Sequence, residues 1–480
     1  MENIIKNKLS QKSMYWSAGL SLYAVIFLWG FWENGPFSLG INATIFLLGL
    51  LFAFRQFFLG RALFVKNNLV WIIPFILIAI SYAMYENPFI KIVNFLAIPI
   101  LALVFLTYAI HPRIKTFLWN SAFFSHLAER AGYIVGAVPV AVKYCVGALL
   151  PSQSIQKNKI KRISVGILLL IIISFTIILP LLGSANPAFS VLTNSFYAWL
   201  GNIIEPELFG RALMFIVFMV GILSILFSWQ KPVKDITKDN EKHQVDSIIS
   251  GIVLTGILVI YLLFLSFELG RLWVSSLPFD FQEAEHLVKS GFWQLFILTL
   301  LNIVFFFGCY RRTSHIVQRL LIVFTGASFF LLASAGWRMA MYVFFYGASY
   351  EKFYAAYTVI FCGILLLWLF SRLFIKKDAD LIKYTAFLLL WMYAIVVVTP
   401  VEQIIFTSNI AFAERYNSRI VLYEMTMLSP AVLGRVQTIT HTNPETFKGW
   451  EYWEENAQKI VDNKTWYELN LENIIYLVGR

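Results

Sequence analysis

The chain has 480 residues, of which 59% are hydrophobic and only 14% carry a charge. A soluble domain cannot bury that much apolar surface, so the composition favours a helical bundle in a lipid bilayer. The formal net charge of +11 is typical of basic loops on one side of a membrane, and we expect no nucleic-acid partner.

Apolar runs of spanning length predict about eleven transmembrane helices. They cover residues 14–32, 37–54, 68–85, 89–110, 164–182, 211–229, 248–268, 291–309, 320–346, 353–374 and 382–400. The first run has no small-residue cleavage site, so we expect it to remain as the first span rather than to be removed as a signal peptide. The expected fold class is all-α, a polytopic integral membrane helical bundle with a small helical extracytoplasmic C-terminal tail.

Lysine and arginine are concentrated in alternate connections between these runs, whereas residues 33–36 and 183–210 contain neither. Because cytoplasmic loops carry the excess of basic residues, this alternation predicts a cytoplasmic N-terminus and an external C-terminus. The expected location is therefore a membrane that borders the cytoplasm, with the bilayer itself as the first partner.

Two further segments are apolar, but the sequence does not show whether they cross the membrane. If residues 131–150 crossed the membrane, the basic cluster 157–162 would lie outside, so we interpret Ile114–Leu150 as an amphipathic or re-entrant element on the cytoplasmic face. Ala185–Leu208 is rich in aromatic residues and lacks lysine and arginine, which suits a helix in the outer interface. Whether 131–150 or 185–208 enters the membrane stays open.

Four parts follow from these patterns. They are a four-helix membrane part (1–113), a cytoplasmic segment (114–163), the main membrane bundle (164–408) and an external tail (409–480). The tail contains Trp450, Trp453 and Trp466. Disordered tails carry few aromatic residues, so we expect this one to be ordered and docked against the outer loops.

The strongest candidate site is Arg338, which lies inside an apolar run and is followed by Tyr342 and Tyr346 on the same helical face. One interpretation is an anion or substrate site, or a charge that changes partner between two conformations. The other is structural, an arginine inside the bundle paired with a carboxylate such as Glu268 or Glu402. Both stay open.

Other charged residues have simpler interpretations. Glu268 and Arg271 are three residues apart and can pair with each other. A candidate outer-face polar cluster follows, with Asp280, Glu283, Glu285 and His286. The sequence has no second histidine cluster to complete a metal site there, so we expect a solvated helix start and no metal. Lys91 is expected to snorkel to the interface.

Three cysteines, Cys145, Cys309 and Cys362, lie far apart and form no ligand motif, so neither a zinc site nor a disulfide framework is predicted. Familiar templates for hydrolases, metalloproteases and nucleotide binding are missing from the sequence, so no catalytic residue and no cofactor is predicted.

Four stretches carry a family resemblance. They are LPLLGSANPAF (179–189), EHLVKSGFWQLFILTLLNIVF (285–305), WRMAMYVFFYGASYEKFYA (337–355) and NIAFAERYNSRIVLYEMTMLSPAVL (409–433). In this order they make the chain resemble, over about residues 165–435, a family of bacterial multi-pass membrane proteins known only as a domain of unknown function. Asn186 stands where that family tends to have aspartate, and Ala348 and Ser349 replace a Leu-Thr pair. The resemblance implies a membrane protein and no activity.

Three functions from different classes remain. The favoured one is a non-enzymatic component of the cell envelope that senses or scaffolds through its tail, with an envelope protein or a small molecule as partner. The alternatives are a transporter or lipid-handling protein that uses the Arg338 region, and a membrane enzyme acting on lipid-linked substrates. Enzymatic activity is therefore uncertain, with the balance against it.

Overall fold

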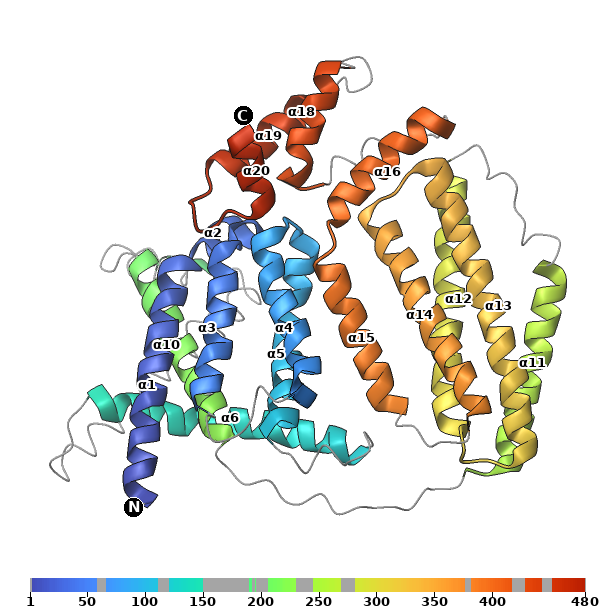
Figure 1. Cartoon of the computed structure of the whole chain (residues 1–480), viewed down its shortest axis with the longest axis horizontal. Coiled ribbons are helices and arrows are strands. Elements are labelled where there is room, and N and C mark those ends of the chain that lie inside the picture. The colour runs from blue at the N-terminus through green and yellow to red at the C-terminus, as the bar shows by residue number, and fades with distance from the viewer. Residues whose placement is uncertain are drawn as a thin grey trace.

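Long apolar helices dominate the structure, as the composition predicts. The computed structural model describes residues 2–57, 66–110, 121–149, 190–191, 195, 206–229, 245–268, 281–375, 381–416, 428–442 and 451–479. Within these residues every regular element is helical. They form two membrane-type bundles joined at one end, a helix across the opposite end of the first bundle, and a small helical tail (Figure 1).

The first bundle contains five long helices. They are α1 (Glu2–Phe27), α3 (Ile41–Phe57), α4 (Lys66–Met84), α5 (Pro88–Ile110) and α10 (Pro206–Ser228). Between α1 and α3 the chain turns through the short α2 (Gly30–Asn34) and the 3-10 helix η1 (Gly35–Ser38). The core is apolar and aromatic, with Trp71, Phe75 and Trp229 buried together. Its helix ends come close to the tail, which positions the site described below.

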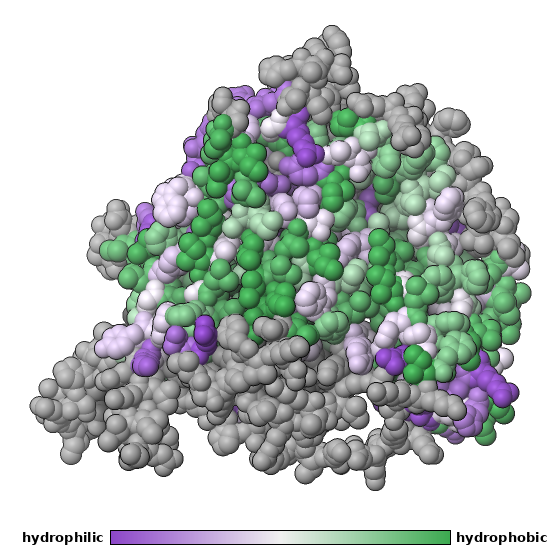
Figure 2. Space-filling view, in the orientation of Figure 1, coloured by the Kyte–Doolittle hydropathy of each residue, from purple (hydrophilic) through white to green (hydrophobic). Residues whose placement is uncertain are grey.

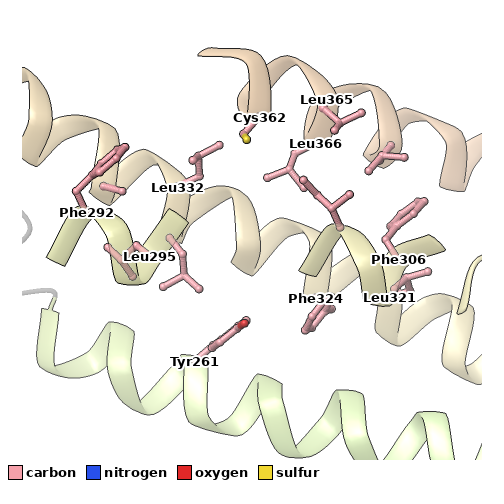
Figure 3. Close-up of a cluster of buried hydrophobic side chains, with 14 of the residues drawn as sticks. Tyr261, Phe292, Leu295, Phe306, Leu321, Phe324, Leu332, Cys362, Leu365 and Leu366 are labelled. Carbon is pink, nitrogen blue, oxygen red and sulfur yellow. The ribbon is translucent and has the colours of Figure 1, made fainter. Parts of the chain in front are cut away.

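The second bundle contains α11 (Ser247–Glu268), α12 (Phe281–Cys309), α13 (His315–Tyr346) and α14 (Tyr350–Phe374). Figure 3 shows its core, in which side chains from all four helices meet. Tyr261 of α11 brings a hydroxyl into this core and donates it to Asn302 Oδ1 of α12 over 2.6 Å, so the buried polar atom has the partner that an apolar environment demands.

Two further helices lead from the second bundle to the tail. The helix α15 (Leu381–Val397) packs on α4, and α16 (Val401–Tyr416) follows it after a bend of 68°. Pro400 stands at the bend, where a proline ends the preceding helix. The predicted boundary between membrane bundle and tail, at 408/409, falls inside α16.

An apolar band crosses the middle of the molecule, between hydrophilic side chains near the tail and near the opposite end (Figure 2). Five described helices are long and apolar enough to span a membrane, or up to seven if each of two bent helix pairs is one span. Their outward side chains include Ile260 and Phe330, which are 63% and 67% exposed. A soluble protein would bury such residues, whereas lipid accepts them.

The described part of the chain is therefore all-helical, and its five to seven candidate spans indicate a membrane protein. The count of about eleven is not confirmed. Three shorter apolar stretches of the first bundle, Ile41–Gln56, Val70–Met84 and Pro88–Val104, belong to α3, α4 and α5, whose full lengths are 17, 19 and 23 residues. The run predicted at 164–182 lies outside the described residues, as does most of 185–208.

The helix α6 (Ser121–Leu149) lies across the end of the first bundle opposite the tail (Figure 1). Its fully buried Arg130 donates to the Ser228 carbonyl at the C-terminus of α10 over 3.2 Å, and its guanidinium lies 4.8 Å from the Trp229 ring centroid. A cation at this position interacts favourably with the helix dipole. The prediction that 114–150 does not cross the membrane is not tested and stays a prediction.

The described tail residues form η4 (Pro430–Val432), α18 (Leu433–Thr442), α19 (Glu451–Asp462) and α20 (Leu471–Gly479). They cover the ends of the first bundle's helices (Figure 1). Backbone hydrogen bonds join the two parts, because Ile41 N donates to Leu469 O and Asn42 N to Tyr467 O, over 3.1 and 2.8 Å. The predicted docking of the tail is thus confirmed for these residues, while the side of the membrane on which it lies stays a prediction.

Gly40 sets how closely the tail approaches. A Cβ atom there would overlap the backbone carbonyl oxygens of Glu468 and Leu469, which cannot move as a side chain end can. We expect Gly40→Ala to destabilise docking by about 1–3 kcal/mol. Limited proteolysis should then cleave the tail faster. Gly19→Ala, where a Cβ would meet nothing within 4 Å, is the control, and equal cleavage of both variants would contradict the prediction.

Candidate functional site

Glu86 lies at the centre of a buried charged cluster where the first bundle meets the tail. It sits in the connection between α4 and α5 and is 1% exposed. Lys91 Nζ lies 2.8 Å from its Oε1, and Lys464 Nζ of the tail lies 2.5 Å from its Oε2. Asn470 Nδ2 also donates to Oε2, over 2.5 Å. One carboxylate therefore binds a membrane helix and the tail at the same time.

Lys91 does not snorkel, so that prediction is wrong. Lys91 is only 3% exposed. Its ammonium donates to the Glu86 carboxylate and also to the carbonyl of Leu39, over 2.5 Å. The carboxylate and this carbonyl, at the end of η1, offer the charge-assisted hydrogen bonds that make burial of an ammonium tolerable. The only charged residues between 67 and 112 are Glu86 and Lys91, which is the sequence signal that could have found the pair.

Lys464 brings the tail's own charge into the cluster. Its side chain is 5% exposed, and it donates to Asn473 Oδ1 over 3.0 Å as well as to Glu86. Burial lowers the pKa of Lys464, while the neighbouring Glu86 carboxylate acts in the opposite direction. Removing one member of such a buried pair typically costs about 3–5 kcal/mol, because the other charge is left uncompensated.

Glu472 of α20 adds a second carboxylate next to Glu86. Its Oε2 accepts a hydrogen bond from the backbone N–H of Glu86 over 2.9 Å, and its Oε1 accepts one from Gln403 Nε2 over 3.4 Å. Burial raises the pKa of Glu472 to about 7, and the negative charge of Glu86 adds to that shift while Lys91 opposes it. Glu472 therefore titrates near neutral pH.

Glu402, at the start of α16, connects the cluster to the second bundle. Tyr350 of α14 donates its hydroxyl to Oε1, and the backbone N–H of Ser429 donates to Oε2 over 3.1 Å. The hydroxyl of Ser429 lies within hydrogen-bond distance of Glu402 Oε2 and, at 3.0 Å, of the Glu86 carbonyl. Residue 429 thus bridges the two buried glutamates.

The tyrosines predicted with Arg338 do come together. The rings of Tyr342 and Tyr346 have centroids 5.4 Å apart, and both side chains are buried in α13. Arg338 on the same helix is half-buried and interacts with neighbouring groups. Its pairing with Glu402 stays a prediction. The buried cation that sequence reasoning missed is Lys352, whose ammonium lies 4.4 Å from the Tyr342 ring centroid.

Lys352, in the first turn of α14, belongs to a second buried polar group at the connection between α13 and α14. Its ammonium donates to Gly347 O over 3.2 Å. Asn409 of α16 accepts from Ala348 N over 2.5 Å and donates to Ala348 O over 2.9 Å, as a neighbouring backbone would. Gly347 has φ of +80°, and a Cβ there would meet the Asn409 amide. Glycine is required at this position for both reasons.

Near Glu86, polar pairs also join the first bundle to the second bundle and to α15. Asn87 donates to the hydroxyl of Tyr354 on α14 over 2.9 Å, and Tyr393 of α15 donates to Asn94 Oδ1 over 2.6 Å. Asn87 in addition accepts from Ile90 N over 3.0 Å and so caps α5. An asparagine before Pro88 is a recognisable helix start, but its long-range partner cannot be read from that pattern.

The remaining predicted site residues are not tested. Arg271 and Asp280 lie outside the described residues, and Glu268 is the last residue of α11, with its side chain outside them as well. The backbones of Glu283, Glu285 and His286 lie in the first turns of α12, again without described side chains. Among the residues that the structure describes, no group of three His, Cys, Asp or Glu side chains could hold a metal ion.

The raised pKa of Glu472 makes tail docking depend on pH. Between pH 4.5, the ordinary value, and about 7, the undocked carboxyl loses its proton while the docked one keeps it. Stability should therefore fall by up to about 3 kcal/mol as pH rises through this window and stay flat above it. Glu472→Gln, which mimics the protonated acid, should melt at a higher temperature than the wild type at about pH 8.

Thermal unfolding of the purified protein from acidic to mildly alkaline pH measures this dependence. The matched control is Glu455→Gln, because Glu455 is an exposed carboxylate on α19 whose partner is Lys459. The control should keep the wild-type pH dependence, while Glu472→Gln should flatten it. Parallel curves for all three proteins would contradict the assignment.

Comparison with known proteins gives a family and nothing more specific. Residues 72–435 match the family model described as Domain of unknown function (DUF4153). The match includes Glu86, Lys91 and Glu402, and it ends before Lys464 and Glu472. No curated protein and no solved structure matches the chain.

Proposed function

We propose that this chain, which belongs to the DUF4153 family of unknown function, is a non-enzymatic component of the cell envelope that senses or scaffolds through a tail fixed rigidly to its membrane bundle. The match to the family model covers more of the chain than the resemblance seen in the sequence, because it begins at residue 72 rather than near 165. The host is a bacterium in this proposal, and the protein lies in the cytoplasmic membrane.

The observation that carries the proposal is the Glu86 cluster. A buried carboxylate paired with Lys91 of a membrane helix and Lys464 of the tail couples the two parts mechanically. A change at the tail is then transmitted to the helix ends, because displacing Lys464 leaves Glu86 with one cation fewer in a buried site. The tail also presents exposed aromatic residues, Tyr452 and Trp466, that are 77% and 67% exposed and suited to contacts with a partner.

A second candidate is a transporter or lipid-handling protein. It is favoured by the polar contacts among the two bundles, α15 and α16, where Tyr350 contacts Glu402, and Tyr354 and Tyr393 contact asparagines. In transporters, the path of the solute is commonly lined by buried polar groups between two helical bundles. In the first candidate these contacts only hold the bundles together.

A complementation test separates the two candidates. The gene for this protein is deleted from its host, and each variant is expressed there in its place. Survival of the cells under detergent or osmotic stress is then measured. Lys464→Met should fail to restore survival because it undocks the tail at a cost of about 3–5 kcal/mol, and Lys464→Arg should restore it in part. Arg338→Gln, in the membrane bundle, should restore it fully.

The reverse pattern would favour the transporter, in which the bundle and not the tail carries function. Membrane levels of each variant are compared by immunoblot, so that failure through lost protein is separated from failure through a lost tail contact.

The proposed topology has about eleven spans, a cytoplasmic N-terminus and an external C-terminus. The tail and the α12–α13 connection lie at opposite ends of the molecule (Figure 1). In a variant with its three cysteines replaced, a membrane-impermeant maleimide should label Tyr452→Cys in intact cells. It should label Ile316→Cys only after permeabilisation. Both native side chains are exposed, at 77% and 80%. Labelling of Ile316→Cys alone in intact cells would invert the topology.

A further inference from the structure

A groove of about 330 Å³ lies between the tail and the turn that joins α1 to α3. One wall belongs to the membrane part and contains Asn34, Phe37 and Ser38. The other belongs to the tail and includes Asn456, Asn463 and Glu468. The volume is at the small end of the range of about 300–1,000 Å³ typical of small-molecule sites. Any ligand bound there touches both parts of the protein.

Hydrogen-bonding groups on both walls are available to a ligand. The side-chain amides of Asn34, Asn456 and Asn463 bond to no other group among the residues that the structure describes. Each amide offers two donor hydrogens and an acceptor oxygen. Glu468 Oε2 accepts from the backbone and the hydroxyl of Thr465, over 2.9 and 2.8 Å, which fixes the carboxylate at the groove wall.

The charges in the groove disfavour an anion. Lys464 is already bound to Glu86 at 2.5 Å, and Lys459 pairs with Glu455 at 2.9 Å. The Glu468 carboxylate, which has no cation among its described hydrogen-bond donors, adds a negative charge to the wall. A phosphate would meet two lysines that each already have a carboxylate partner, and one further carboxylate. A neutral ligand rich in hydroxyl groups meets donors and acceptors instead.

Apolar surface is present beside these polar groups. Phe37 from the membrane part and Ile460 from the tail both line the groove. A sugar ring has one face of C–H groups and a rim of hydroxyls, so it matches a site that combines an aromatic ring with amides and a carboxylate. Ligands with hydroxyls alone do not use Phe37, and purely apolar ligands leave the amides unpaired.

We propose that this groove binds a neutral or N-acetylated sugar of one or two rings, and that binding fastens the tail to the membrane bundle. The inference rests on the proposed sensing function and names its ligand class. Because Lys464 is both a lining residue and the partner of Glu86, occupancy of the groove and docking of the tail are linked. A sugar that contacts both walls stabilises the docked state in proportion to its occupancy.

Isothermal titration of the full chain tests the inference, in a detergent that contains no sugar. The free probes are diacetylchitobiose, maltose and inorganic phosphate, each up to about 10 mM, well above a millimolar Kd. A second arm uses nanodiscs with or without a monoglycosyl lipid, which distinguishes a lipid-linked sugar from a free one. We expect one of the sugars, free or lipid-linked, to bind and to raise the melting temperature, and phosphate to have no effect.

The variant Asn456→Leu with Asn463→Leu removes two amides from the tail wall, so it should bind about tenfold more weakly. Gln458→Leu is the matched control on the same helix, because Gln458 does not line the groove and contacts Asp462 instead. Its affinity should equal that of the wild type. Proteolysis of the tail without ligand confirms that both variants are docked.

Three results would overturn the inference: binding of phosphate in place of sugar, no binding of any sugar in either arm, or equal binding by the double variant and the control. None of them affects the complementation by Lys464 and Arg338 variants, so a wrong ligand class and a wrong function give different outcomes.

Discussion

The burial of the Glu86 carboxylate between two ammonium groups is the constraint on which the arrangement of the molecule depends. An isolated carboxylate in an apolar environment costs many kcal/mol, and so does an isolated lysine. Here Lys91 and Lys464 compensate Glu86 at 2.8 and 2.5 Å. The α4–α5 connection, the start of α5 and the tail must therefore occupy their positions together, because each supplies the partner that another needs.

Further polar contacts extend this constraint into the second bundle. Ser429 touches both Glu86 and Glu402, and Glu402 receives the hydroxyl of Tyr350 on α14. Each bundle has its own apolar core, of which Figure 3 shows that of the second bundle. The polar contacts fix how the bundles and the tail meet. Buried ion pairs are weak evidence for stability, but a partner lost from one is costly, so such networks favour one arrangement over its alternatives.

The same contacts bring together the two walls of the groove beside the cluster. One wall comes from the turn after α1 and the other from α19 and the residues that follow it. These segments are more than four hundred residues apart in the chain. They meet because Lys464 is fixed on Glu86 and because Gly40 admits the backbone of Glu468 and Leu469. Docking and ligand binding are thus two consequences of one close approach.

Composition and periodicity by themselves determined that this is an all-helical membrane protein with a folded tail, because lipid requires long apolar helices whatever their neighbours. They also picked out Tyr342 and Tyr346, which share a helical face by their spacing alone. The partners of Glu86, Lys91, Lys352 and Lys464 were decided only by the tertiary structure. A buried charge is stabilised by whichever opposite group packs against it, and for Glu86 one of those groups lies 378 residues away.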